Sequence, residues 1–515
     1  MIDDHSQYLL NTYARPPLLF THGRGCKIYA TSPTSPSPTS SSSSSSTPSN
    51  RVEYLDFTAG IAVNALGHGD PQIAQLMADQ ASRLVHSSNV CWNEYAGQLA
   101  QLLVTQTRDH HGLGLTREGK TGAKVFFTNS GTESNEGALK FARLVGKNRQ
   151  SSSSSGEKTS LVCFSNAFHG RSLGALSVTP NPKYQLPFSP LIPNVRVGQL
   201  GDIDSLSTLI TDEVCGVIVE PIQGEGGLNE ASKEWFVALA KRAREVGAVL
   251  IYDEIQVRQR GGDESGSKAL HGLMDNGSTC STTFSAGCTE RGPCGRIAIS
   301  PLKHSESRER IRASKRFAHT PGLSRCRPDI VTMAKPLANG FPIGAILVRD
   351  EIAEQVGVGE SRRLPVTFPS SIVNARGRRS LGMHGTTFGG QPLATRIGHH
   401  VISRLSSPDF LSTMRDTAAH FDALLSRLPR LFPSIIPSPI RGRGLMRGIP
   451  FSHPAAPAEL VKRARHRGVL LLTAGSDAVR LVPSLNVTEQ ECDHAAGVIE
   501  SCLAMMQEEG KWAGK

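Results

Sequence analysis

Apolar and polar positions alternate between strand-like and helix-like patterns from about Ala123 to Ala345. Short continuous apolar runs occur at Gly216–Val219 and Ala248–Tyr252, and apolar residues at helical spacing cover Lys233–Glu245. Strands that are apolar throughout are buried on both faces, which is typical of parallel sheets covered by helices. The pattern therefore predicts an α/β fold built on a mostly parallel sheet.

The pattern changes after Thr386 and Thr387. Further along, the spacing predicts two helices, Leu393–Leu405 and Thr417–Leu428, and short strands near Gly444 and at Val479–Val482. A chain of 515 residues exceeds the usual size of one hydrophobic core, so we expect two domains. We predict an N-terminal segment at 1–65, a large domain at 66–392 and a small α+β domain at 393–515.

Four segments interrupt this organisation. Residues 31–50 are almost wholly Ser, Thr and Pro and are expected to form a disordered surface loop, and a second serine run lies at 151–155. Residues 257–328 and 361–380 follow no period, and the first is far longer than the ~12–15 residues at which an unstructured loop becomes unusual. We interpret these two irregular insertions as translated intron sequence, and we expect 257–328 to be disordered or absent from the mature protein.

Carboxylates and a lysine follow two of the apolar runs. Asp253 and Glu254 close the strand that begins at Val249, and Lys335 follows the run Asp329–Ala334. Two such strands in one sheet would place an acid and an amine at the same rim. An acid and an amine in this arrangement are typical of a pyridoxal phosphate (PLP) enzyme, in which a carboxylate keeps the pyridine nitrogen protonated and an amine forms a Schiff base.

A candidate phosphate site lies earlier in the chain. Ala123–Thr128 is predicted to be a strand and Glu133–Arg143 a helix, and the turn between them contains Gly131. Ser130 and Glu133 match a capping box, so free N–H groups at the helix start would face an anion in the turn. A nucleotide-binding protein could use the same turn, but no Gly-x-Gly-x-x-Gly and no P-loop lysine accompanies it.

Seven motifs in one order resemble those of class III, fold-type I aminotransferases, and within that class those of the acetylornithine aminotransferases of arginine biosynthesis. The resemblance runs from about Ser6 to the C-terminus, with gaps at the insertions. After Gln256 the family continues with a Gly-rich loop containing Arg-Thr-Gly, which this chain lacks. The motifs are Asn129-Ser-Gly-Thr-Glu-Ser-Asn-Glu, Phe168-His-Gly-Arg, Glu220-Pro-Ile-Gln-Gly-Glu-Gly-Gly, Asp253-Glu-Ile-Gln, Ala334-Lys-Pro-Leu-Ala-Asn-Gly, His384-Gly-Thr-Thr-Phe-Gly-Gly and Arg441-Gly-Arg-Gly-Leu.

The resemblance implies a PLP-binding large domain, and a small domain that also takes in the N-terminal segment. Thr387 would reach the phosphate of the neighbouring subunit's cofactor, which implies a homodimer. The implied cofactor contacts are Gly131 and Thr132 on the phosphate, Phe168 on the ring face, Asp253 on the ring nitrogen, Gln256 near the ring hydroxyl, and Lys335 as Schiff-base lysine and proton shuttle.

The resemblance also implies the substrates, N2-acetylornithine and 2-oxoglutarate, and no metal. Arg171 and Arg441 would clamp carboxylates, because the guanidinium fork binds a carboxylate bidentately. Glu225 would pair with Arg441 when the donor has no carboxylate there, and Thr386 would also contact substrate. The alternatives are an ornithine or 4-aminobutyrate transaminase, or an inactive product of a faulty gene model.

A net charge of +11 could indicate a nucleic-acid-binding protein. The distribution of the charge argues against an organised nucleic-acid-binding face. Residues 257–328 carry a net charge of +7 and residues 361–380 carry +5, so the excess belongs to the insertions.

The ten cysteines show no paired CxxC spacing, and four of them (Cys280, Cys288, Cys294 and Cys326) fall in one irregular stretch, so we expect reduced thiols in an intracellular compartment. No apolar run approaches the ~18 residues that cross a bilayer, so a soluble protein without membrane association is expected. The first residues lack a transit-peptide pattern, and the family resemblance implies the mitochondrial matrix, with the cytoplasm as the alternative.

Overall fold

The computed structural model describes six ranges of the chain: 6–31, 51–111, 122–149, 157–256, 326–356 and 383–512. The Ser/Thr/Pro stretch from residue 32 on, the serine run, residues 257–325 and residues 361–380 lie outside the described residues. The predictions made for those segments therefore stay predictions. At their described ends the expected disorder is wrong, because Thr31 is the last residue of a strand and Cys326 is buried, with its carbonyl accepting from the Tyr252 hydroxyl at 3.0 Å.

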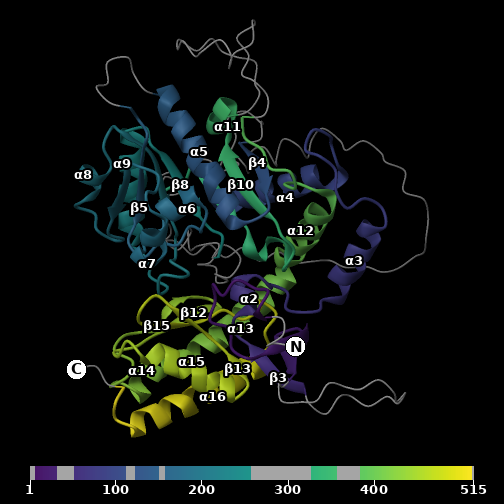
Figure 1. Ribbon diagram of the computed structural model, residues 1–515, viewed down its shortest axis with the longest axis vertical. Coiled ribbons are helices and arrows are strands. Elements are labelled where there is room, and N and C mark those ends of the chain that lie inside the picture. Colours follow the sequence, from purple (N-terminus) through teal and green to yellow (C-terminus); the bar gives the residue numbers. More distant parts are fainter. Residues whose placement is uncertain are drawn as a thin grey trace, which may run out of the picture.

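A seven-stranded sheet forms the centre of the larger body (Figure 1). Four of its six strand pairings are parallel, and only β10 runs antiparallel to its two neighbours. The expectation of an α/β fold with a mostly parallel sheet is confirmed. In spatial order the strands are β4 (Ala123–Thr128), β10 (Gly344–Arg349), β9 (Ile330–Met333), β8 (Val249–Asp253), β7 (Val214–Val219), β5 (Ser160–Phe164) and β6 (Val195–Gly198).

Helices cover both faces of this sheet, because its central strands are apolar on both sides. In β8, Val249 and Ile251 pack into the core shared with α5, whereas Leu250 and Tyr252 face the core that holds α9. The helices of this body are α3 (Pro71–Ala81), α4 (Glu94–His111), α5 (Gly131–Arg149), α6 (Leu173–Ser177), α7 (Pro182–Gln185), η1 (Leu186–Phe188), α8 (Leu206–Leu209), α9 (Lys233–Glu245), η2 (Lys335–Ala338), α11 (Asp350–Val356) and α12 (Pro392–Leu405).

The C-terminal elements form a second body with the N-terminal strands, seen as yellow and purple ribbons below the sheet in Figure 1. One four-stranded sheet joins β13 (Val469–Leu470) in parallel to β3 (Arg51–Asp56), which continues to β2 (Lys27–Thr31) and β1 (Leu19–Arg24). The domain boundaries at 65 and 392 stay predictions. The remaining elements are α2 (Ala59–Ala62), α13 (Pro408–Ser426), α14 (Leu428–Leu431), α15 (Ala456–His466), α16 (Glu489–Glu508) and the sheet of β11 (Arg441–Arg443), β12 (Met446–Pro450), β15 (Ala478–Leu481) and β14 (Leu472–Ala474).

Three predicted elements differ clearly from the structure. The helix predicted at Glu133–Arg143 is longer at both ends, from Gly131 to Arg149. The helix predicted at Thr417–Leu428 begins earlier, at Pro408, because the Ser407 side chain accepts a hydrogen bond from the N–H of Phe410 and caps it there. The strand predicted near Gly444 is two strands, and Gly444 lies in the turn between them with φ 55°. The helix at Lys233–Glu245 and the strand at Ala123–Thr128 are confirmed with their bounds.

Seven cysteines lie in the described ranges, and all of them are free thiols. Burial raises the pKa of Cys26, Cys163 and Cys492 to about 12, which makes them inert packing residues at neutral pH. Within the described ranges, no helix is both long and apolar enough to cross a membrane.

Candidate active site

The candidate site lies where the parallel strands of the central sheet end. Asp253 closes β8, Lys335 follows β9 and Glu220 follows β7, so their side chains meet at one rim. A cavity of about 390 Å³ opens there, at the edge where open α/β sheets bind their ligands. The predicted residues that line it are Gly131, Thr132, Phe168, Arg171, Asp253, Gln256 and Lys335.

Asp253 is buried and held by three hydrogen bonds. Its Oδ2 accepts from Asn135 Nδ2 and from the ring Nδ1–H of His169, both at 2.8 Å, and its Oδ1 accepts from the N–H of Ile255 at 3.1 Å. Asn135 is itself fixed, because its Oδ1 accepts from the Thr332 hydroxyl of β9 at 2.7 Å. The carboxylate therefore faces the cavity in one orientation, with lone pairs left for a protonated ring nitrogen.

Lys335 opens η2 in a strained backbone conformation, with φ 21°. Burial and the nearby cation of Arg480 lower the pKa of its amine, and the carboxylates of Glu225, Asp253 and Glu220 raise it, so that the net pKa is about 8. About a tenth of this amine is therefore neutral and nucleophilic at pH 7, far more than for a lysine with the ordinary pKa of 10.5.

The turn between β4 and α5 can hold a phosphate. The first N–H groups of α5 have no partner inside the helix, and Gly131 and Thr132 place them at the cavity. A Cβ on Gly131 would lie 2.7 Å from Ile255 Cδ1, so the backbone can lie this deep only as glycine. Half of the predicted capping box is present, because Ser130 Oγ accepts from the N–H of Glu133 at 3.3 Å. The return bond differs, because Glu133 Oε2 accepts from the N–H of Asn129 rather than from that of Ser130.

Glu220 and His169 also belong to this site, although the sequence interpretation gave them no role. Glu220 is buried and joins two loops: its Oε1 accepts from the N–H of Phe168 at 2.8 Å, and its Oε2 accepts from the N–H of Gly224 at 3.0 Å. Burial raises the pKa of Glu220, and the nearby Asp253 adds to this shift. His169 lies in the motif Phe168-His-Gly-Arg, and Glu220 begins the motif Glu220-Pro-Ile-Gln. Glu220 could have been found from the sequence, because it is a carboxylate at the end of an apolar strand, as Asp253 is.

Arg171 lies at the mouth of the cavity and is exposed to solvent. Its guanidinium carbon lies 4.1 Å from the centroid of the Tyr184 ring and 5.8 Å from that of Phe168. A cation is therefore present where a substrate carboxylate would enter.

The second predicted clamp, Arg441, is placed differently from expectation. Its guanidinium is engaged by Asp477, with Nη2–Oδ2 at 2.7 Å and Nη1–Oδ1 at 3.2 Å, and it does not line the cavity. Glu225 instead pairs with Arg480, whose Nη2 lies 3.1 Å from Glu225 Oε2. The predicted pair of Arg441 and Glu225 is therefore corrected to Arg480 and Glu225.

Arg480 is the charged residue that the sequence interpretation missed. It is 1% exposed, lies in β15, and donates from Nη1 to Gln256 Oε1 at 2.9 Å and to the carbonyl of Gly224 at 2.6 Å. The sequence does contain a signal for it, because Arg480 is the single charged residue in the apolar run of β15. An arginine buried in a strand requires a polar or charged partner, which points to a site nearby.

Thr386 and Thr387 lie beside the phosphate turn without lining the cavity. Thr386 Oγ1 accepts from Asn129 Nδ2 at 2.8 Å, and the carbonyl of Thr386 accepts from Asn89 Nδ2 at 3.0 Å. Thr387 is exposed to solvent.

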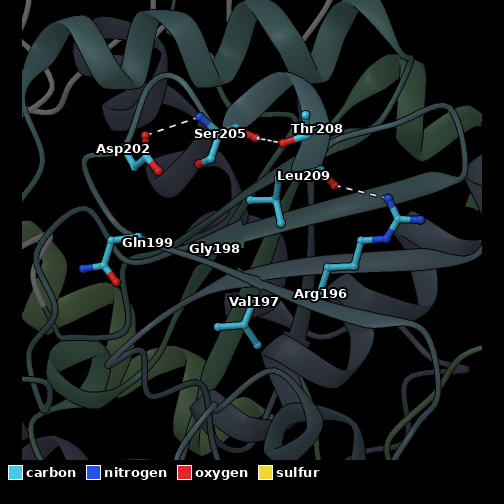
Figure 2. A pocket seen from close by; sticks show the side chains of 8 residues that line it. All are labelled: Arg196, Val197, Gly198, Gln199, Asp202, Ser205, Thr208 and Leu209. Carbon is cyan, nitrogen blue, oxygen red and sulfur yellow. Dashed lines mark hydrogen bonds between the residues drawn. The ribbon is translucent and has the colours of Figure 1, made fainter.

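A second hollow, of about 490 Å³, lies between β6 and α8, at the edge of the central sheet (Figure 2). Its one cation is engaged, because Arg196 pairs with Glu213 and donates to the Thr211 hydroxyl and the Leu209 carbonyl. The acid and the amine of the candidate site are not among its lining residues, so it adds nothing to that chemistry.

Sequence comparison agrees with the fold and the site. The class-III aminotransferase family matches residues 39–265 and 312–503, which is more than half of the chain. The chain belongs to the class-III aminotransferases.

Its relatives include the mitochondrial acetylornithine aminotransferase of Neurospora crassa, 37% identical over 97% of this chain and 86% of the relative. The enzyme of the same name from Yarrowia lipolytica is 37% identical, covering 98% of this chain and 95% of the relative. Among solved structures, ornithine aminotransferase from Toxoplasma gondii has a TM-score of 0.71 at 22% identity over 99% of this chain and 95% of that chain. N-acetylornithine aminotransferase from Stenotrophomonas maltophilia has a TM-score of 0.63 at 24% identity, over 99% and 100%. These structural likenesses support the fold.

Proposed function

We propose that this protein is a PLP-dependent transaminase that moves the δ-amino group of N2-acetylornithine to 2-oxoglutarate. The products are N-acetylglutamate 5-semialdehyde and glutamate, formed in two half-reactions by a ping-pong mechanism. The observation that carries the proposal is the meeting of Lys335, Asp253 and the α5 N-terminus in one cavity. The names of the sequence relatives support the choice of donor.

The residues of the cavity fit PLP. Asp253, Phe168, Gly131 and Thr132 all line the cavity. Asp253 would keep the ring nitrogen protonated, Phe168 would contact the ring, and Gly131 and Thr132 would hold the phosphate. Because Gln256 Oε1 already accepts from Arg480, its amide NH₂ is left to donate to the ring hydroxyl. When bound, PLP supplies a covalent anchor for the amino group and a ring that accepts electrons.

Lys335 Nζ moves the proton in each half-reaction. Once the donor amine has taken its place, the free Lys335 amine takes a proton from the substrate carbon that bears the nitrogen and delivers it on the cofactor side. A pKa of about 8 suits this role, because the same group must both accept and release a proton near neutral pH.

The two arginines bind carboxylates. Arg171 grips the α-carboxylate of acetylornithine, and both Arg171 and Arg480 grip 2-oxoglutarate. Glu225 neutralises Arg480 while the donor, which has no second carboxylate, is bound, and the second carboxylate of 2-oxoglutarate replaces Glu225 in the other half-reaction.

The proposed assembly is a homodimer in which Thr387 serves the partner's cofactor. Apolar side chains around the Thr387 loop are exposed in the single chain, with Trp92 99% and Phe388 56% exposed. Hydrogen bonds from Asn89 and Asn93 join this loop to the segment that carries Trp92. The mitochondrial names of the relatives support the mitochondrial matrix as the location.

The test is a comparison of amino donors with the PLP-loaded protein. Acetylornithine should give a higher kcat/KM than ornithine or 4-aminobutyrate with 2-oxoglutarate as acceptor. A preference for ornithine or 4-aminobutyrate would replace the donor while keeping the class. A purified protein that takes up no PLP and stays colourless would favour the inactive gene product instead.

A further inference from the structure

Arg171 is held by aromatic rings and not by a carboxylate. In the described part of the chain its guanidinium makes no ion pair and no hydrogen bond, although it lies 4.1 Å from the Tyr184 ring centroid. A ring face attracts a cation through its quadrupole but leaves the positive charge in place. The other arginines near the site differ in this respect, because Arg441 and Arg480 each pair with a carboxylate.

The Tyr184 ring is fixed in place by its own short helix. The side chain of Asn181 caps α7 by accepting from the N–H of Lys183 at 3.0 Å, and Pro182 occupies the first helical position. Gln185 Nε2 then donates to the carbonyls of Leu176 and Ser177, which ties α7 to α6. The ring is therefore a support whose position is set before any substrate arrives.

The same ring also contacts Phe168, an aromatic residue that lines the cavity. The Phe168 and Tyr184 rings meet edge to face, with centroids 6.3 Å apart at 81°, and Arg171 lies over both. Phe168 is anchored through its N–H to Glu220. Tyr184 thus links the position of the Arg171 cation to Phe168 in the cavity wall.

We propose that Tyr184 is a positioning residue that holds the Arg171 guanidinium, uncompensated and correctly placed, for the substrate carboxylate. This rests on the proposed function, in which Arg171 is the carboxylate clamp. The ring supplies orientation without competing for the N–H groups, whereas a carboxylate partner would have to be displaced before each turnover. The distance from the clamp to the reacting carbon, and hence the accepted donor length, is set partly by this ring.

The experiment measures glutarate, a dicarboxylate without a reactive ketone, binding to the PLP-loaded full chain by calorimetry. Tyr184→Leu should raise the Kd of glutarate by about 3- to 30-fold, whereas Tyr184→Phe, which keeps the ring, should stay near the wild type. Lys183→Leu, on the exposed side of the same helix, is the matched control. Equal cofactor absorbance and equal Tm show that each variant is folded and loaded.

A double-mutant cycle separates a positioning role from a general one. In an Arg171→Leu background, Tyr184→Leu should have no further effect on the Kd of glutarate, because the group it positions is gone. With acetylornithine, Tyr184→Leu should raise KM by a similar factor while kcat changes less than twofold.

The proposal would be overturned by an unchanged Kd for Tyr184→Leu, by additive losses in the cycle, or by an equal loss in Tyr184→Phe. A wild-type chain that binds no glutarate would also overturn it. A wild-type chain that binds glutarate but does not transaminate acetylornithine refutes the proposed function alone, and the calorimetry still decides the role of Tyr184.

Discussion

At the residue scale, the pKa of Lys335 is set by opposing influences of burial and of neighbouring charges. Burial and the Arg480 cation favour its neutral amine, and Glu225, Asp253 and Glu220 favour the ammonium form. The net result is a pKa of about 8 in place of 10.5, which prepares the amine for covalent capture of an aldehyde.

The rate at which the PLP-free protein takes up PLP should therefore follow this pKa. Only the neutral amine attacks, so the uptake rate should rise with pH and reach half its plateau near pH 8. Stopped-flow absorbance between pH 6 and 10 measures it. Lys335→Ala is the control and should give neither the visible band nor transamination, with an unchanged unfolding temperature. Covalent uptake by that variant would assign the lysine elsewhere.

Arg480 and Arg441 should behave very differently when each is changed to glutamine. Arg480→Gln removes a buried cation that would bind the second carboxylate, so the KM for 2-oxoglutarate should rise about 30-fold or more. Arg441→Gln should change that KM less than about threefold, because Asp477 already occupies its guanidinium. Arg480→Gln should also raise the pH midpoint of PLP uptake, since a cation that lowers the pKa of Lys335 is gone. Equal effects of the two substitutions on KM would refute the assignment of Arg480.

At the scale of elements, the turn before α5 depends on the absence of a Cβ atom at Gly131. Gly131 packs against Ile255, which follows Asp253 on the loop after β8, so the phosphate turn and the acid-bearing strand are in direct contact. Interiors this tightly packed do not accept an added methyl group without a shift of the backbone.

Gly131→Ala should therefore weaken PLP binding by about 10- to 100-fold, because its Cβ would lie 2.7 Å from Ile255 Cδ1. Titration of PLP followed by absorbance measures the change. Combining it with Ile255→Ala removes the clash and should restore most of the affinity. No rescue in the double variant would mean that the glycine is needed for some reason other than space.

At the scale of the whole molecule, one chain exposes an apolar surface beside the Thr387 loop, which a second copy would cover in the proposed dimer. Trp92→Asp places a charge in that surface and should shift the protein from dimer to monomer, with loss of PLP, as measured by analytical ultracentrifugation. Leu431→Asp in α14, 49% exposed and in the other body of the molecule, is the matched control and should leave the dimer intact. A wild-type monomer that retains PLP would refute the shared site.

The origin of residues 257–328 is a question about the gene. The matched family ranges leave out 266–311, which agrees with an insertion there. We expect the spliced message to join the region after Gln256 to Pro328 through a short Gly-rich loop. Sequencing the transcript decides this, and a long form that binds PLP and transaminates acetylornithine would show that the insertion is compatible with a working site.

The sequence by itself determined the sheet and the meeting of its acid and amine. Apolar runs buried on both faces specify parallel strands, and parallel strands bring their carboxyl ends to one rim. Asp253 and Lys335 could therefore be placed together although they are far apart in the chain. The turn at Gly131 was equally predictable, because capping and glycine chemistry are local.

Only the tertiary structure decided which arginine joins Glu225 and Gln256, and what holds Arg171. Arg441 lies in β11 and Arg480 in β15, the two strands that flank β12 in one small sheet, and sequence spacing cannot say which of the two points toward Gln256 and Glu225. The support of Arg171 by Tyr184 is likewise invisible in sequence, since α7 must first fold back on α6. Strand and turn patterns are properties of neighbouring residues, whereas ion pairs and ring contacts between elements depend on how those elements pack.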